Sequence, residues 1–196
     1  MSKIFYIMGK SSTGKDTIFK HLLADETLNL KRIVPYTTRP IRIKEKEGVE
    51  YHFTDENGLR SIKEEGRLIE VREYNTFQGI WKYFTALDNE LDVSKNNYII
   101  IGTIESYIAT KKYFGEDTIV PILVELSDGD RLQRALNREK KQEHPKYEEL
   151  CRRFLADAQD FSEENILRAG ITKRFQNEDL DQCVSEIKEY IQWILK

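Results

Sequence analysis

The chain has 196 residues, of which 39% are hydrophobic and 33% are charged. This length suits one domain with small insertions, and the hydrophobic content can build a core, which excludes a wholly disordered chain. The 31 basic and 34 acidic side chains give a net charge of −3, which excludes the overall cationic surface that non-specific nucleic-acid binding requires. We therefore expect no nucleic-acid partner.

The apolar segments and the cysteines indicate the cellular compartment of the protein. The longest apolar stretches, Tyr98–Ile101 and Val120–Val124, are far shorter than the roughly 20 residues of a membrane-spanning helix. Basic side chains interrupt the first apolar segment, so no signal peptide is predicted. Cys151 and Cys183 show neither metal-binding spacing nor a disulfide framework. These features predict a cytoplasmic protein without a membrane partner.

The first predicted element is a short buried strand over Ile4–Met8, rich in aromatic and β-branched residues. From Thr17 the pattern becomes helical, with Ile18, Leu22 and Leu23 on one face. A loop with a glycine near each end joins the strand to the helix. This succession of strand, loop and helix is the context that a phosphate-binding loop requires.

The next stretch, residues 33–85, combines strand-like segments with many basic and aromatic side chains. Val49–Phe53 and Leu68–Val71 are predicted strands, and Glu56–Glu65 is a predicted short helix. We therefore predict a small, mostly β insertion. Its aromatic side chains at Phe77, Trp81 and Phe84 are expected to pack inside it.

Strands and helices alternate in the following part of the chain. Strands are predicted at Tyr98–Ile101 and Ile119–Leu126, and helices at Glu105–Tyr113 and Asp128–Lys141. Such alternation predicts a parallel sheet covered by helices on both faces. Ligands are then expected at the carboxyl ends of the strands.

Charged helices dominate residues 128–161, with an interruption near His144 and Pro145. The chain closes with the segment 174–177, a loop and an amphipathic helix. The apolar side chains of that helix are Val184, Ile187, Ile191 and Ile194.

The loop after the first strand has the pattern Gly-x-x-x-x-Gly-Lys, which ends at Lys15. Its backbone N–H groups can surround phosphate oxygens, the following helix adds its positive end, and Lys15 can reach the β- and γ-phosphates. An ordinary glycine turn is the competing interpretation, and the flanking strand and helix favour the phosphate site. The predicted ATP-binding residues of this segment are Gly9, Lys10, Ser11, Ser12, Thr13, Gly14, Lys15, Asp16 and Thr17.

One position of this segment departs from the usual pattern. Asp16 stands where a Ser or Thr hydroxyl normally holds Mg²⁺, and Thr17 points about 100° further around the helix. Asp16 could contact the metal through water or could cap the helix. We expect Mg²⁺ to accompany ATP, held largely by phosphates and water, and we assign no protein ligand to it.

A second motif lies within residues 37–53. It runs Thr-Thr-Arg to Arg39, continues with Arg42, Glu and Gly, and ends with Tyr-x-Phe from Tyr51 to Phe53. Together with the phosphate-binding loop, this motif resembles the signature of guanylate kinases, and the likeness extends over nearly the whole chain. A solvated basic β-hairpin is the alternative interpretation of the second motif alone.

The resemblance implies an α/β protein with a three-layer P-loop fold. Its expected parts are a five-stranded, mainly parallel sheet, a small β-rich acceptor-binding insertion and a helical lid. The predicted boundaries are 1–34, 86–127 and 156–196 for the core, 35–85 for the insertion that binds the nucleoside monophosphate, and 128–155 for the lid.

The resemblance also implies an activity, the transfer of the ATP γ-phosphoryl group to a phosphomonoester, most simply GMP. By similarity, Arg39, Arg42, Tyr51 and Tyr83 hold the phosphate of the acceptor, because guanidinium groups can hold a phosphate dianion bidentately. The expected partners are therefore ATP and a nucleoside monophosphate, and both a monomer and a homodimer remain open.

The predicted lid carries further arginines. By similarity, Arg134, Arg138 and Arg153 close over ATP and neutralise charge on the transferred group, together with Lys15 and Arg39 as the catalytic set. A solvated helix surface is the competing interpretation of the first two. Asn177 resembles the residue that lies against adenine, and a simple turn is its alternative.

Base recognition follows the family only in part. Guanylate kinases read guanine with a Ser or Thr before the Thr-Thr-Arg run, a Glu, and an Asp after the next strand. Glu70 fits the second role, whereas Pro35 or Tyr36 stands in the first and Thr103 in the third, with Glu105 as another partial substitute. A lost carboxylate weakens discrimination for guanine.

Two alternative functions therefore stay open. One is a kinase of the same fold that acts on a different acceptor, such as another nucleoside monophosphate or a ribose bisphosphate. The other is a non-catalytic binding module that resembles guanylate kinases.

Overall fold

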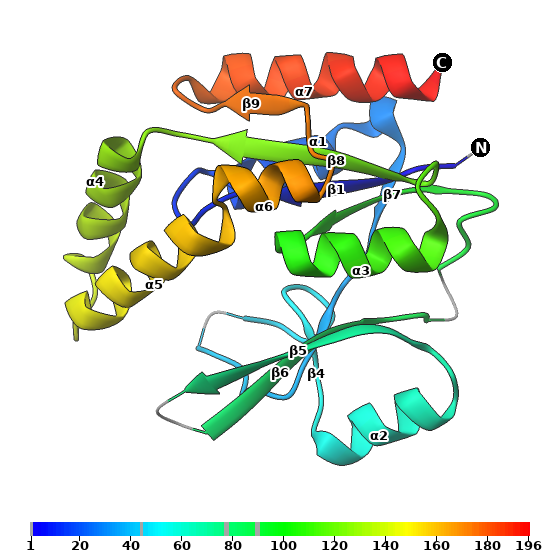
Figure 1. The fold of residues 1–196 in the computed structure, drawn as a ribbon, viewed down its shortest axis with the longest axis horizontal. Coiled ribbons are helices and arrows are strands. Elements are labelled where there is room, and N and C mark those ends of the chain that lie inside the picture. The colour runs from blue at the N-terminus through cyan, green and yellow to red at the C-terminus, as the bar shows by residue number, and fades with distance from the viewer. Residues whose placement is uncertain (1, 44, 77–78, 89–90) are drawn as a thin grey trace.

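The structure is a computed structural model that describes residues 2–43, 45–76, 79–88 and 91–196. Its larger sheet has five strands in the order β2-β7-β1-β8-β9, and every neighbouring pair is parallel. Figure 1 shows this sheet in the upper half of the molecule. The strands in chain order are β1 (Ile4–Met8), β2 (Leu30–Arg32), β7 (Asn97–Ile101), β8 (Ile119–Glu125) and β9 (Arg174–Gln176).

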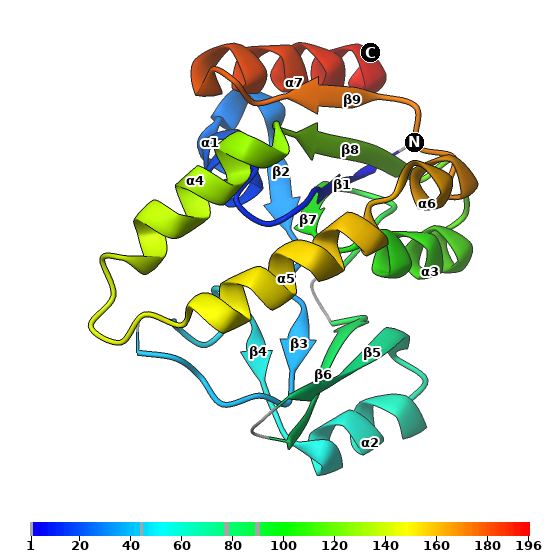
Figure 2. The ribbon, with the colours of Figure 1, turned by 60° about the vertical axis from the view of Figure 1, so that its left-hand side comes forward.

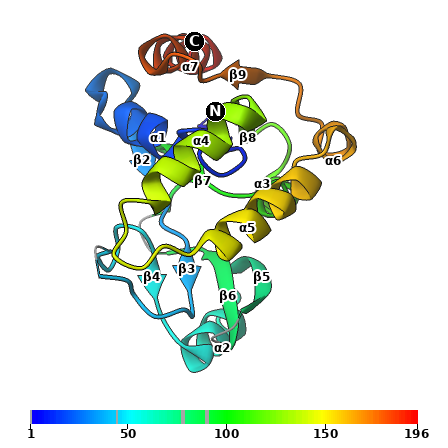
Figure 3. The same cartoon turned by 90° about the vertical axis from the view of Figure 1, so that its left-hand side faces the viewer.

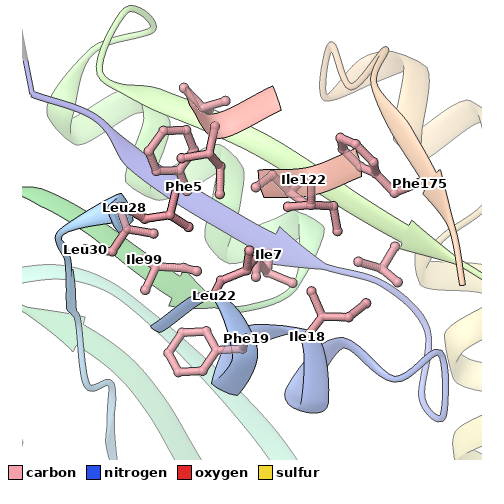
Figure 4. Packing of buried hydrophobic residues seen from close by; sticks show 14 of the residues in the cluster. Phe5, Ile7, Ile18, Phe19, Leu22, Leu28, Leu30, Ile99, Ile122 and Phe175 are labelled. Atoms are coloured by element: carbon pink, nitrogen blue, oxygen red, sulfur yellow. The ribbon is translucent and has the colours of Figure 1, made fainter. Parts of the chain in front are cut away.

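Strand β1 is buried along its whole length because helices cover both faces of the sheet. Its side chains alternate between two cores. Phe5 and Ile7 pack in one core with apolar residues of α1 (Lys15–Ala24) and α7 (Leu180–Leu195), which Figure 4 shows from close by. Tyr6 and Met8 pack in the other core with residues of α3 (Ile104–Phe114) and α6 (Glu163–Arg168). The predicted three layers are therefore confirmed.

Most predicted elements of this sheet are confirmed to within one or two residues, including the strands now labelled β1, β7 and β8. The sequence did not identify the two edge strands, β2 and β9. Each has three residues, which is too short for a strand pattern to emerge. Only pairing with β7 and β8 defines them.

A second sheet forms the predicted insertion, with strand order β4-β3-β6-β5. Helix α2 (Glu56–Glu64) packs Leu59 and Ile62 against one face of it, on Phe84 and Ala86. The opposite face is turned toward the core sheet and α3 (Figures 1 and 2). The strands are β3 (Tyr36–Thr37), β4 (His52–Phe53), β5 (Leu68–Thr76) and β6 (Gly79–Ala86).

Two sequence predictions in the insertion need comment. The strand predicted over Val49–Phe53 was too long, because the chain turns there: Gly48 has a φ of +71° and its N–H donates to the Tyr51 carbonyl. The aromatic packing predicted for Phe77, and the position of Lys44 within the second motif, lie outside the described residues.

After β8 the chain forms two charged helices, α4 (Asp128–Glu139) and α5 (Tyr147–Asp160). Helix α5 runs between the core and the second sheet (Figures 2 and 3). The interruption predicted near His144 and Pro145 is confirmed. Within the described parts of the chain, no helix is both long and apolar enough to cross a membrane.

Candidate active site

The phosphate-binding motif forms the loop between β1 and α1. Gly9 and Gly14 have φ angles of +154° and +90°, a region that L side chains rarely adopt. A Cβ atom would also collide with the Val124 carbonyl of β8 at Gly9, and with the Asn177 side chain at Gly14. Both positions therefore need glycine because the chain turns and other atoms approach closely.

Buried hydrogen bonds hold this loop against the end of the sheet. The Thr13 hydroxyl donates to the Lys10 carbonyl at 3.0 Å, and the Asn177 side-chain amide donates to the Thr13 carbonyl at 2.6 Å. Asn177 is itself fixed because its backbone N–H donates to the Glu125 carbonyl of β8. Asn177 thus supports the loop, and its contact with adenine stays a prediction.

The charged groups at the start of α1 differ in exposure. Lys15 is half-buried, and its Nζ lies 3.9 Å from the carboxylate of Asp16, which is 78% exposed. Thr17 is exposed as well. Across the described ranges, no three or more His, Cys, Asp or Glu side chains gather in a group that could hold a metal ion. The exposed Asp16 carboxylate is an oxygen donor beside Lys15 that could contact a divalent metal.

The predicted lid arginines lie on the same side as the loop. The Arg138 guanidinium donates to the Ser12 hydroxyl at 3.2 Å, and Arg134 donates to the Asn177 carbonyl at 3.2 Å. Arg153 of α5 lines a pocket together with Ser12 and Arg138. The structure thus brings cationic side chains from both α4 and α5 to the loop.

A buried ionic clamp around Arg131 joins the same helices to the loop, and it was not predicted from the sequence. Arg131 of α4 is only 1% exposed, and its guanidinium donates to the Asp128 carboxylate at 2.7 Å and to the Ser11 carbonyl at 3.0 Å. Asp157 of α5 accepts from the Ser11 backbone N–H at 2.8 Å and lies 3.6 Å from Arg131. The ring of Phe154 lies under the guanidinium.

The second cluster lies on the face of the insertion that is turned toward the core. Register places Tyr83 beside Arg72 on one side and Thr37 on the other, and Thr85 beside Glu70. A β-bulge between Leu68 and Glu70 puts the side chains of these two residues on opposite faces of the sheet. Leu68 packs with the α2 core, and Glu70 lies on the inner face.

Arg39 is the buried centre of this cluster, with 3% of its side chain exposed. Its Nη1 and Nη2 donate to the two Glu45 oxygens at 2.7 and 2.6 Å, and it lies over the Tyr51 and Phe53 rings. The Tyr83 ring stands 5.6 Å from Tyr51. Burial lowers the pKa of Arg39, but Glu45 and Tyr83 more than offset it, so the net shift is upward. Arg39 therefore stays a cation.

A polar group lies at the other end of the same face. Glu70 is buried, and its carboxylate accepts from the Thr85 hydroxyl at 2.7 Å and from Arg72 Nε at 2.9 Å. Arg72 Nη1 donates to the Thr103 hydroxyl at 3.2 Å. Because Thr103 caps α3, this bond joins the insertion to the core.

The two clusters are close enough to affect each other electrostatically. Burial, followed by Tyr83, raises the pKa of the Tyr51 phenol, while Arg39 and Arg72 oppose the rise and the Asp16 carboxylate adds to it. Asp16 belongs to the phosphate-binding segment and Tyr51 to the insertion, so a charge of the first cluster acts on a residue of the second.

Comparison with known proteins agrees with this arrangement. A family model described as guanylate kinase matches residues 1–193. The chain belongs to the guanylate kinase family.

Its relatives match the whole chain or part of it. A guanylate kinase from Porphyromonas gingivalis is 29% identical over 203 residues and covers 100% of both chains. One from Malacoplasma penetrans is 37% identical over 109 residues, which are 56% of this chain and 54% of the relative. The crystal structure of guanylate kinase from Anaplasma phagocytophilum shares the fold, with a TM-score of 0.65 at 21% identity over 97% of this chain and 85% of that one.

Most site residues expected for a guanylate kinase gather in the two clusters. Arg42 does not join them with its side chain, which is exposed; only its backbone N–H donates to Glu45. Arg72, Arg131 and Asp157 were missed. Their contacts with Thr103 and Ser11 join residues that are distant in sequence. The local signals in the sequence were Glu70, two residues before Arg72, and Asp128, three residues before Arg131 on one helix face.

Proposed function

We propose that the protein transfers the γ-phosphoryl group of ATP to GMP and so forms ADP and GDP. The observation that carries this proposal is a pair of clusters, each of which is suited to bind an anion. One is a loop of backbone N–H groups with Lys15, and the other is the buried Arg39 with Tyr51 and Tyr83. Two anionic substrates held in line need no covalent enzyme intermediate.

In this proposal the loop binds ATP. Backbone N–H groups of the loop would surround the β-phosphate, apart from that of Ser11, which donates to Asp157, and Lys15 would reach the β- and γ-phosphates. Arg138 already contacts the loop through Ser12, and Arg153 lines the same pocket. Together with Arg134 they would neutralise charge on the transferred group, which is where catalysis of phosphoryl transfer mainly arises.

Mg²⁺ would arrive with ATP. Asp16 is the carboxylate placed to reach it, directly or through water, because it is exposed beside Lys15. Held there, the metal would supply positive charge that offsets the charge of the phosphate oxygens. Asn177 would keep the loop in shape through Thr13 and would lie near the adenine.

The insertion would bind the acceptor. Arg39, Tyr51 and Tyr83 would hold its phosphate, and Arg42 would swing in from its exposed position. Glu45 holds both Nη atoms of Arg39, so the phosphate would bond on the Nε side of the guanidinium, where Nε is buried without a hydrogen-bond partner among the described residues. Glu70 and Thr103 would contact the base at the other end of the same face.

Closure would complete the site. We assign residues 35–85 to the acceptor-binding part and 128–155 to the lid, with the remaining residues as the core. Movement of these two parts toward the loop would exclude water from the transferring group.

The test is an assay of the purified protein with ATP, Mg²⁺ and a panel of acceptors, followed by chromatography of the nucleotides. We expect ADP and GDP in equal amounts with GMP, and far less product with AMP, CMP, UMP or ribose 1,5-bisphosphate. A clear preference for one of the others would support the kinase of different specificity. ATP binding without transfer to any acceptor would support the non-catalytic module.

A further inference from the structure

The mechanism above leaves Arg72 of β5 without a role. Its side chain is 11% exposed, and its fork grips Glu70 through Nε at 2.9 Å and Nη2 at 3.3 Å. Its third nitrogen, Nη1, donates to Thr103 of the core. Removing a guanidinium from water costs free energy that well-placed hydrogen bonds must offset.

Arg72 occupies the middle of the acceptor face. It is the cross-strand neighbour of Tyr83, which we place at the phosphate, and it stands two residues from Glu70, which we place at the base. Two residues of a strand span about 7 Å. Burial lowers the pKa of Arg72, but Glu70, Tyr6 and Tyr74 more than compensate, so the group remains a cation there.

The hydrogen bonds of Glu70 and Arg72 leave some of their acceptor and donor positions unused. A carboxylate can accept about four hydrogen bonds, and Thr85 and Arg72 donate three to Glu70. A guanidinium carries five N–H donors, of which the bonds to Glu70 and Thr103 use three and an interaction with Tyr74 can use a fourth, so at least one is left among the described contacts. Glu70 and Arg72 thus present an acceptor and donors side by side.

This pattern is complementary to a 6-oxopurine. In guanine the N1–H donor stands next to the O6 acceptor, and arginine is the side chain that most often recognises the O6 and N7 edge. We propose that Arg72 is a specificity-determining residue that donates to O6 of the acceptor base, while Glu70 accepts from N1–H. The assignment rests on the proposed function, because the N1–H group lies against Glu70 only if GMP is the acceptor.

The same arrangement would reject adenine. With the base in this orientation, the N1 lone pair of adenine would face the Glu70 carboxylate, and its 6-amino group would face the Arg72 cation. Both contacts are repulsive, so Arg72 would contribute to specificity by exclusion as well as by attraction.

The test compares Arg72→Ala and Arg72→Lys with the wild type, using GMP, IMP, AMP and 6-thio-GMP as acceptors. We expect KM for GMP and for IMP to rise together by about tenfold or more, with kcat within about twofold, because both bases carry O6. With Arg72→Ala, the KM for AMP should stay the same or fall, because the cation that faces its 6-amino group is removed. Arg60→Ala, an exposed arginine of α2 on the outer side of the same sheet, is the matched control and should behave as the wild type.

The sulfur analogue tests the same contact from the side of the ligand. Sulfur is a weak acceptor, so 6-thio-GMP should have a higher KM than GMP with the wild type. This difference should vanish in the Arg72 variants if the guanidinium is the donor. If the alanine variant does not fold, Arg72→Lys replaces it, because lysine keeps a positive charge beside Glu70. The comparison of GMP with 6-thio-GMP on the wild type needs no variant.

The outcomes separate the two proposals. A wild type that phosphorylates other acceptors but not GMP would refute the proposed function and this assignment with it. A wild type that uses GMP, with an unchanged preference for GMP over AMP in folded Arg72 variants, would refute the assignment alone. An equal rise in KM for GMP, IMP and AMP would make Arg72 a phosphate contact. It would also refute the proposed contact of Arg72 with O6 of the base. Equal KM values for GMP and 6-thio-GMP on the wild type would overturn it as well.

Discussion

At Gly14 the backbone has a φ of +90°, and a Cβ would meet the amide that Asn177 directs at the Thr13 carbonyl. The spacing of Gly9 and Gly14 was enough to predict this loop, because few backbone shapes place glycines there before a lysine and a helix. The support from Asn177 was not visible in the sequence, since the two residues that it joins are 164 positions apart.

Lys15 gives the most direct test at the scale of a single residue. We expect Lys15→Ala to lower kcat for GDP formation by about 10²- to 10³-fold, because one preorganised cation at the transferring phosphate is lost. The fold should remain, since the side chain is partly exposed and forms only a 3.9 Å ion pair. Steady-state kinetics and circular dichroism check the two expectations. Lys20→Ala, an exposed lysine on the same helix, is the control, and near-normal turnover in Lys15→Ala would refute the role of Lys15.

Among the elements, α4 and α5 are joined to the phosphate-binding loop by the Arg131 clamp. Replacing Arg131 with Met would leave Asp157 and Asp128 without their buried cation. We expect a loss of about 3–5 kcal/mol in the free energy of unfolding, measured by chemical denaturation. The double variant Arg131→Met with Asp157→Ala should recover part of this loss. A single variant as stable as the wild type would contradict the clamp.

The end of α1 is joined to α7 by an ion pair that gives a pH-dependent prediction. Lys188, followed by Thr27, holds the pKa of Asp25 down to about 2, from 3.8. A carboxylate with a lowered pKa stabilises the fold above its unfolded value, and this stabilisation is lost as pH falls through the folded value.

We therefore expect Asp25→Asn to have a lower Tm than the wild type above about pH 4, with the difference closing as pH falls toward 2. Lys188→Gln should show the same trend, because it removes the other half of the 2.5 Å pair. Thermal unfolding followed by circular dichroism across this range is the measurement. A constant difference between pH 2 and pH 5 would show that the charge is not the cause.

The elements also show what sequence patterns can and cannot predict. Strands β1, β7 and β8 were predictable because each is a run of β-branched or aromatic residues that the structure buries. The edge strands β2 and β9 were not predictable, because three residues are too few to show an alternating hydrophobic pattern. The bulge that brings Glu70 to the inner face was also invisible, since it depends on pairing with β6.

At the scale of the whole molecule, the parallel sheet explains why the sites meet. The carboxyl ends of β1, β7 and β8 lie at one edge, where the phosphate-binding loop, Thr103 and the start of α4 follow them. The second sheet lies below that edge in Figure 3, and Arg72 of β5 bonds it to Thr103. Motifs could predict the residues of each site, whereas Arg72, which bonds the insertion to α3 through Thr103, emerges only when the two parts are seen together.

The central claim is that the two anion sites face each other across one substrate-binding region. Calorimetric titration with a two-headed nucleotide, in which a chain of phosphates joins adenosine to guanosine, tests this most directly. We predict one molecule bound per chain, at least about a hundredfold tighter than ATP or GMP, and displaced by either, because the second head binds intramolecularly. Affinity no greater than that of ATP, or failure of GMP to compete, would contradict the account.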